Sequence, residues 1–236
     1  MRDAPPALRR ELPPAVIALA RRCGGNARNS DVDHVLLTQT GFMRADASHR
    51  WAPFRARQSI ALDRIGFAWR AATGPLGCIA VTDALDETGP RLTVMALGLI
   101  PLARVAADAA LTKGELQRYL AELPLAPDAI LRNPALDWEV LSPASLRVMA
   151  TCRGVRAHVD LTLGADGLVA SVFAPDRSSL EGGGMVERPW TGRFSDYRTH
   201  QGRQLPFAAE VAWTIDGEEV AYWRGAMASW DLGVRK

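Results

Sequence analysis

The sequence predicts a mainly β protein: one strongly bent antiparallel sheet or open half-barrel of about 11–13 strands. Segments rich in aromatic and β-branched residues alternate with Gly and Pro turns along most of the 236 residues. Tight-turn dipeptides join consecutive segments. The predicted strands in the second half of the chain share an apolar face, which another element must cover. We expect one domain over 1–236, with an N-terminal helix within 1–25 and a helical insertion at 112–132 that covers the concave face.

The composition argues against several classes of protein. A net charge of +2, without a stripe of Lys and Arg, gives no indication of nucleic-acid binding. The three cysteines, Cys23, Cys78 and Cys152, are too few and too scattered for a disulfide framework and are compatible with a reducing compartment. No apolar run approaches transmembrane length, and the charged start does not resemble a signal peptide. We therefore expect a cytoplasmic protein with no transmembrane segment.

The first elements follow from local chemistry. Pro13 and Pro14 suit the first turn of a helix, where a missing N–H costs little, and Gly24 suits its end. The segments that follow read as strands, at 34–43, 50–62, 65–73, 77–85, 91–99 and 100–106. In the fourth of these the alternation places Asp83 on the apolar face.

A helical insertion interrupts the strands. Thr112 and Glu115 have the spacing of a capping box, and Leu111 and Leu116 have the spacing of a hydrophobic staple. An apolar stripe follows, Pro124 ends this helix, and a second short helix is expected from about 127 to 132.

The strands resume at 136–141, 145–152, 155–163, 168–174, 190–198, 205–215 and 218–230, with a flexible loop expected at 181–185. Three two-residue turns, Arg153-Gly154, Gln201-Gly202 and Asp216-Gly217, would fix the register of the hairpins around them. The first turn places Arg147 opposite Asp160, a complementary pair that supports the register independently of the apolar pattern.

The same register defines a candidate site on the apolar face of the last three strands. Asp196 and Arg224 would lie on this face roughly 10–12 Å apart between Cα atoms. They form either a buried ion pair that fixes the register or a polar hook that orients a ligand head group. Trp223 is expected on the opposite surface. The expected ligand-binding residues are Trp190, Phe194, Asp196, Phe207, Val211, Trp213, Tyr222 and Arg224.

Three stretches carry a resemblance to a known family: RYLAELPLAPDAI from Arg118, PWTGRFSDYR from Pro189, and the pair LPFAAEVAW and VAYWRG within 205–225. They resemble a family of uncharacterised bacterial proteins, known only as a domain of unknown function, over most of the chain. The order of helix, strands, helical insertion and strands is also similar to the periplasmic lipoprotein carriers. Those are half-barrels whose concave face is plugged by the inserted helices and holds acyl chains. A secreted carrier is expected to have a signal peptide and a lipidation cysteine, and from this sequence we expect neither.

Function remains open between two classes. The sequence has no P-loop, G-x-G-x-x-G, G-x-S-x-G or H-E-x-x-H, and the four histidines fall at strand ends, in turns or on the polar face, so we expect no metal and no cofactor. One hypothesis is a binder or carrier of a hydrophobic, lipid-like small molecule. The alternative is an enzyme acting on an apolar substrate, with Asp83 or Asp196 as acid or base. Two carboxylates within about 6 Å of each other would favour the enzyme. The oligomeric state is not indicated.

Overall fold

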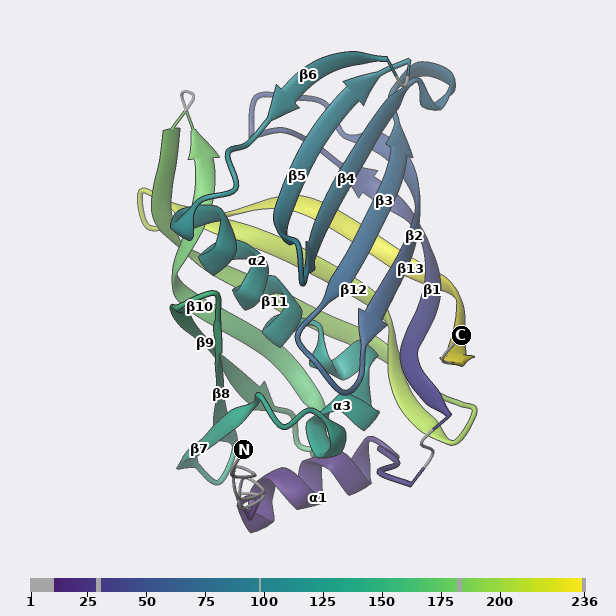
Figure 1. Cartoon of the computed structure of the whole chain (residues 1–236), viewed down its shortest axis with the longest axis vertical. Helices are drawn as coiled ribbons and strands as arrows, with labels where there is room; N and C mark the ends of the chain where they lie inside the picture. The colour runs from purple at the N-terminus through teal and green to yellow at the C-terminus, as the bar shows by residue number, and fades with distance from the viewer. Residues whose placement is uncertain (1–10, 29–30, 98, 182–183, 235–236) are drawn as a thin grey trace, which may run out of the picture.

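The computed structural model describes residues 11–28, 31–97, 99–181 and 184–234. These residues form one 13-stranded antiparallel sheet with the order β6-β5-β4-β3-β2-β1-β13-β12-β11-β10-β9-β8-β7 (Figure 1). The sheet consists of two meanders, β1–β6 and β7–β13. They are joined where β1 and β13, the first and last strands along the chain, pair with each other. The predicted class, a single strongly bent antiparallel sheet in the form of a half-barrel, is confirmed.

The strands agree with the predicted segments in number and place. The first meander consists of β1 (Val32–Met43), β2 (Ala52–Ala61), β3 (Phe67–Thr73), β4 (Ile79–Asp86), β5 (Gly89–Ala96) and β6 (Ile100–Arg104). The second consists of β7 (Asp137–Ser142), β8 (Ser145–Cys152), β9 (Val155–Leu163), β10 (Val169–Glu181), β11 (Gly184–His200), β12 (Arg203–Ile215) and β13 (Glu218–Val234). The predicted loop at 181–185 is wrong, because β10 and β11 continue as a ladder to Glu181 and Gly184; Gly182 and Gly183 lie outside the described residues.

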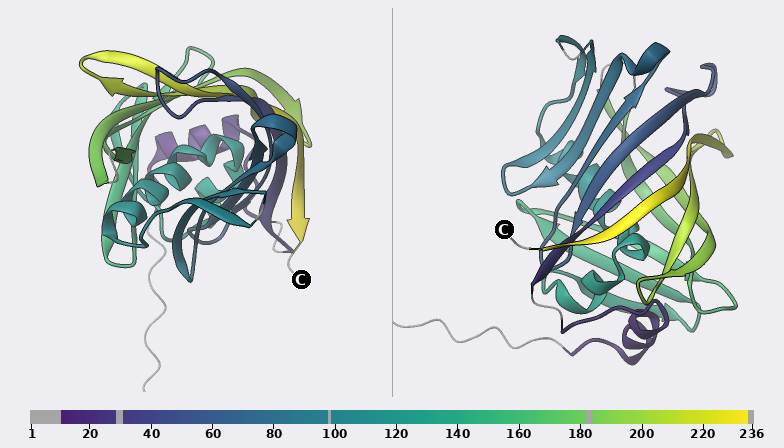
Figure 2. Two further views of the ribbon diagram at one scale, coloured as in Figure 1. Left: turned by 90° about the horizontal axis from the view of Figure 1, so that it is seen from above. Right: turned by 90° about the vertical axis from the view of Figure 1, so that its right-hand side faces the viewer.

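The second and third helices lie on the concave side of the sheet, which curves round them, and the first helix lies across the lower end of the half-barrel in the view of Figure 1 (Figure 2). They are α1 (Pro14–Arg22), α2 (Ala109–Ala121) and α3 (Pro127–Arg132), with 3-10 turns at Pro75–Gly77 and Leu123–Leu125. Helix α2 packs against β8, β9 and β10 on one side and β4 and β5 on the other. The prediction that the insertion covers the concave face is confirmed. None of the described helices is long and apolar enough to span a membrane.

The three predicted turns have the backbone that a two-residue hairpin requires. Arg153, Gln201 and Asp216 have φ of 51°, 47° and 51°, and the glycine after each also has a positive φ. Positive φ at both central positions matches the right-handed twist of the flanking strands. The register around Arg153-Gly154 is confirmed, with Arg147 opposite Asp160 and joined to it by two hydrogen bonds of 2.7 and 2.9 Å.

Helix α2 begins earlier than the capping-box pattern predicts. Its N-cap is Asp108, whose side chain accepts a hydrogen bond from the Leu111 N–H at 2.8 Å. Thr112 lies inside the helix, where its hydroxyl donates to the Asp108 carbonyl at 2.7 Å. The capping box at Thr112 is therefore wrong, because an aspartate one turn earlier satisfies the free N–H groups first.

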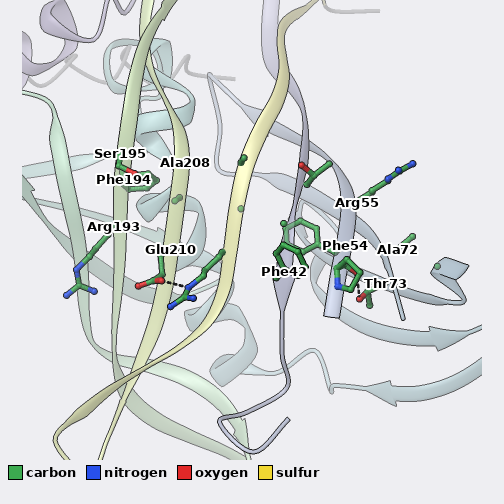
Figure 3. Close-up of a pocket in the computed structure, with 18 of the residues that line it drawn as sticks. Phe42, Phe54, Arg55, Ala72, Thr73, Arg193, Phe194, Ser195, Ala208 and Glu210 are labelled. Carbon is green, nitrogen blue, oxygen red and sulfur yellow. Dashed lines mark hydrogen bonds and ion pairs between the residues drawn. The ribbon is translucent and has the colours of Figure 1, made fainter. Parts of the chain in front are cut away.

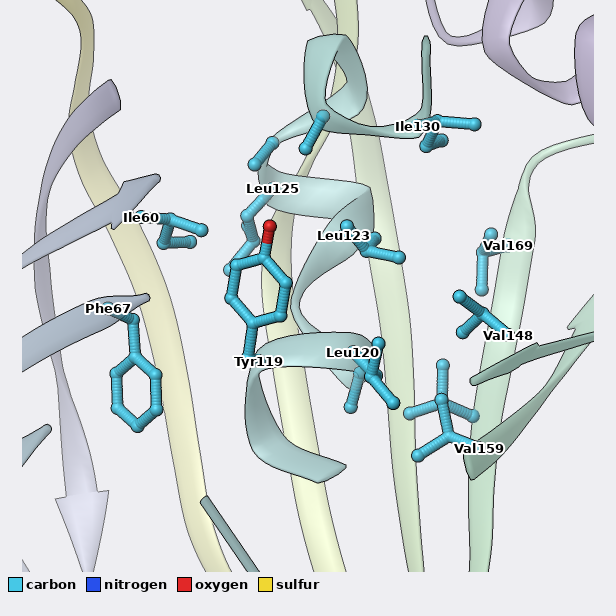
Figure 4. Packing of buried hydrophobic residues seen from close by; sticks show 14 of the residues in the cluster. Ile60, Phe67, Tyr119, Leu120, Leu123, Leu125, Ile130, Val148, Val159 and Val169 are labelled. Atoms are coloured by element: carbon cyan, nitrogen blue, oxygen red, sulfur yellow. The ribbon is translucent and has the colours of Figure 1, made fainter. Parts of the chain in front are cut away.

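The core lies between the helices and both meanders (Figure 4). Tyr119 is fully buried, and its hydroxyl donates to the Arg64 carbonyl at 2.9 Å and accepts from Asn133 at 2.7 Å. A buried ion pair of 2.8 Å joins Asp128 of α3 to Arg203 at the start of β12. These polar contacts fix the helices relative to the sheet, since each partner left alone would be a buried unsatisfied group.

We predict that Asp108→Ala lowers the free energy of unfolding by about 1 kcal/mol, because it removes the side-chain acceptor at the start of α2. Urea denaturation followed by circular dichroism measures this change. Asp108→Asn keeps an acceptor oxygen at the same place and is the matched control, expected to stay near the wild type. An unchanged midpoint for Asp108→Ala would place the start of α2 elsewhere.

Candidate functional site

A cavity of about 290 Å³ lies between α2 and the concave face of the sheet. Its walls are mostly apolar, and sheet strands from both meanders contribute to them. The aromatic and methionine side chains that line it are Trp69, Trp190, Trp213, Trp223, Phe194, Phe207, Tyr222, Met43, Met185 and Met227. Cavities of this kind, apolar with a few polar groups, are the usual sites for small molecules.

Six of the eight residues singled out from the sequence line this cavity: Trp190, Phe194, Phe207, Val211, Trp213 and Tyr222. Tyr222 and Trp213 stack with ring centroids 5.6 Å apart, and the Trp190 indole N–H donates to the Tyr222 hydroxyl at 3.0 Å. The Trp190 N–H and the Tyr222 hydroxyl thus have each other as hydrogen-bond partners. The rest of these rings forms apolar wall of the cavity.

The placement of Asp196 on the apolar face is wrong. The register between β11 and β12 is as predicted, with Phe194 opposite Ala209 and His200 opposite Arg203. Asp196 itself, however, has a φ of 54°, in the left-handed region that breaks the alternation of a strand. Its side chain is exposed and pairs with Arg198 instead, with two hydrogen bonds of 2.5 and 3.0 Å.

The placement of Arg224 on the apolar face is also wrong. The predicted pairing of β12 with β13 holds from the turn to Ala212, but a bulge at Tyr222 then shifts the partner of Val211 to Trp223. From this bulge to Met227, where a second irregularity follows, the side chains of β13 lie on the face opposite to the predicted one. Arg224 therefore points to the outside and pairs with Glu210, whereas Trp223, expected on the outer surface, points into the cavity. No pair between Asp196 and Arg224 exists.

Two glycines give the tryptophan rings room to lie flat on the sheet. A Cβ added at Gly225 would come within 2.2 Å of the Trp223 ring, and one added at Gly192 would come within 3.2 Å of the Trp190 ring. In both cases the tryptophan stands two residues before the glycine, on the same face of the strand. The repeated W-x-G pattern thus places two flat tryptophan rings in the cavity wall.

Helix α2 supplies a polar side to the cavity. Arg118 lies over the rings of Phe67 and Trp69, at 4.9 and 5.1 Å, and forms ion pairs with Asp83 of β4 and with Glu122, the latter at 2.9 Å. Glu122 in turn accepts a hydrogen bond from Gln58 of β2. Burial raises the pKa of Glu122, and the adjacent Arg118 opposes that rise. The prediction that Asp83 lies on the apolar face is confirmed.

Glu115 is the least solvated acid of this group, with 4% of its surface exposed. Burial raises its pKa well above the usual range; the nearby Asp83 raises it further, and Arg177 and Arg118 act in the opposite direction. Oε2 of Glu115 and Oδ1 of Asp83 are both buried without a hydrogen-bond partner. The raised pKa of Glu115 favours its neutral, protonated form.

Arg177 completes the polar groups of the cavity. Its guanidinium lies 4.6 Å from the Trp190 ring and 5.7 Å from the Trp213 ring, and 8% of the residue is exposed. Its Nε is buried without a hydrogen-bond partner. Among the described residues no carboxylate lies within ion-pair distance of this guanidinium, in contrast to Arg118.

Sequence reasoning missed Glu115, Arg118, Glu122 and Arg177. For the first three a signal existed: their spacing of three and then four residues puts them on one face of a helix, next to the apolar stripe. For Arg177 there was none, because a bulge between Ala174 and Arg177 sets its direction.

A second hollow, of about 1380 Å³, lies outside the sheet next to Phe42, Arg55 and Arg193 (Figure 3). It is broad and open, and two of its charged residues, Glu210 and Arg224, pair with each other. No set of unpaired polar groups converges in it among the described residues. We therefore place the candidate site in the inner cavity.

Comparison with known proteins identifies the class to which the chain belongs. Residues 4–225 match the model of a family of unknown function (DUF6544), and the chain is a member of that family. No curated protein matches the sequence. Membership therefore brings no activity and no site residues with it.

One solved structure supports the fold, and a second is less similar. A LolA superfamily protein from Nitrosomonas europaea is similar over 94% of each chain, with 11% identity and a TM-score of 0.50. A DUF1329 family protein from Desulfovibrio piger, 9% identical, covers 92% of this chain and 90% of its own, with a TM-score of 0.48. At such identities the first likeness shows a shared half-barrel fold, as the order of elements predicted, and no more.

We predict that the stability of the protein falls as pH rises above the ordinary range of a glutamate, and that Glu115→Gln reduces this fall. A pKa raised by folding means that the folded state holds the proton longer than the unfolded state, so folding is favoured at low pH and loses this advantage as pH rises through the raised pKa. One such group contributes a slope of at most about 1.4 kcal/mol per pH unit. Urea denaturation from pH 4 upward measures it.

Glu218→Gln, in the exposed β12–β13 turn, is the control and should keep the wild-type profile. Equal slopes for the wild type and Glu115→Gln would show that Glu115 is ionised in the folded protein.

Proposed function

We propose that this protein binds or carries a hydrophobic, lipid-like small molecule in the cavity between α2 and the sheet. The observation that carries the proposal is the wall of that cavity, which combines four tryptophans with three methionines on a curved sheet. Tryptophan rings offer large apolar contact areas at fixed positions, while methionine side chains adapt to irregular shapes. Such a wall suits a flexible, chain-like ligand.

The size of the cavity favours a small occupant. A volume of about 290 Å³ is at the lower end of the range of small-molecule pockets. The likeness of the fold to a LolA superfamily protein supports the same class of function, as an analogy between folds. Because α2 forms one whole side of the cavity, we propose that a longer ligand enters by moving α2 away from the sheet.

One observation favours the alternative, an enzyme acting on an apolar substrate. Asp83 and Glu115 are two buried carboxyl groups that both line the cavity, and a neutral Glu115 could donate a proton to a substrate. Asp83 is less suited to act as a base, because Arg118 already occupies one of its oxygens. Asp196 is not a candidate for this chemistry, since it lies outside the cavity.

We predict that the protein binds long-chain fatty acids or alcohols with roughly micromolar affinity, as expected for burial of an apolar chain. Val211→Asp should weaken this binding by about tenfold or more, because it puts a charge in the apolar wall. Val140→Asp, at an exposed position on β7, is the matched control and should bind like the wild type. Quenching of tryptophan fluorescence measures the affinity, and thermal melts verify folding.

Native mass spectrometry of the purified protein separates the two functions. A co-purified lipid, recovered chemically unchanged after incubation, supports a carrier. Conversion of that molecule by the wild type but not by Glu115→Gln supports the enzyme. Absence of binding across several chain lengths would contradict both.

A further inference from the structure

The cavity contains a buried cation with unused hydrogen-bond donors, and this identifies the chemistry of the ligand. We propose that the ligand is an anionic amphiphile whose carboxylate or phosphate monoester head group binds the guanidinium of Arg177, while its chain lies along the tryptophan wall. This inference rests on the proposed binding function and specifies the ligand class.

The surroundings of Arg177 leave its donors free. A guanidinium carries five N–H donors in its plane, and its two faces are suited to stacking. The guanidinium carbon of Arg177 lies over the rings of Trp190 and Trp213, at 4.6 and 5.7 Å from the ring centroids. No hydrogen bond among the described residues uses its N–H groups, although only 8% of the residue is exposed. These cation–π contacts hold the group in place and leave its donors for a bidentate oxygen ligand.

The backbone directs Arg177 to this position. The ladder between β10 and β11 is interrupted between Ala174 and Arg177, and bulges of this type turn a side chain toward a site. Ser178 and Ser179, the next two residues, also line the cavity and add hydroxyl donors beside the guanidinium. An orphaned buried donor in a native fold calls for an explanation, and a bound anion supplies one.

The balance of charge in the cavity permits an anion at Arg177 and not at Arg118. Arg118 is already neutralised by its ion pairs with Asp83 and Glu122. Glu115 is the carboxyl whose charge would compete for Arg177, and its burial raises its pKa and so disfavours that charge. The positive charge of Arg177 is therefore left for the ligand.

Matched ligands test this inference on the wild-type protein. Hexadecanoic acid, hexadecanol and hexadecyl phosphate share one chain and differ in the head group. We expect the acid or the phosphate to bind about tenfold or more tightly than the alcohol, as a charge-assisted bidentate pair in a buried site should give. The stronger of the two anions identifies the head group.

Variants locate the effect. Arg177→Met should lose most of the preference for the anion and keep its affinity for the alcohol, which also shows that the variant folds. Arg156→Met, which removes an exposed arginine on β9, should behave like the wild type. Equal binding of alcohol and anions by the wild type would overturn this inference and leave the proposed function standing. If none of the three ligands binds, the proposed function itself is wrong.

Discussion

The arrangement of this protein depends on how one buried guanidinium, that of Arg118, holds helix α2 on the sheet. A concave apolar sheet cannot face water, and α2 is the element that covers it. Arg118 joins the helix to β4 through Asp83, and Glu122 extends the connection to β2 through Gln58. Helix α2 is therefore held on the first meander by an ion pair and a charged hydrogen bond, which a helix with a purely apolar inner face could not form.

The other side of α2 is held by different forces. Helix α2 packs directly on β10, where a Cβ added at Gly114 would lie in ordinary van der Waals contact with the Ser178 carbonyl oxygen, at 3.4 Å. Lys113 and Gln117 bond to Asp176 at 2.6 and 2.9 Å, near the surface. The cavity lies between these two attachments, so its polar groups belong both to the structure and to the candidate site.

Much of the fold could be predicted from local chemistry. A two-residue turn with a glycine second fixes the backbone of a hairpin, and the pairing of its strands then follows by counting, as at Arg153-Gly154. The start of α1 could likewise be predicted from local chemistry, because proline suits the first turn of a helix. Trp190, Phe194, Phe207, Val211 and Trp213 are placed correctly by such counting, because the register between β11 and β12 holds from the turn as far as Trp190. Tyr222 lies at the bulge itself.

What could not be predicted depends on contacts distant in the chain. The bulge at Tyr222 brings both Tyr222 and Trp223 to the concave face, where Trp223 stacks on Phe54 of β2 with ring centroids 5.4 Å apart. No residue near Tyr222 in the sequence indicates that Trp223 will stack on Phe54. The left-handed backbone of Asp196 is a similar case, since an aspartate can adopt it and does so rarely.

The pairing of β1 with β13 has a consequence for the way the chain is made. Leu37 lies opposite Trp230, so a strand from the beginning of the sheet receives its neighbour only when synthesis has nearly reached residue 234. Until then one edge of β1 is an open row of N–H and C=O groups, which can pair with other chains. Contacts between such distant segments also form slowly. The growing chain thus carries an unprotected edge from the synthesis of β1 until that of β13, and chaperones that shield strand edges would act there.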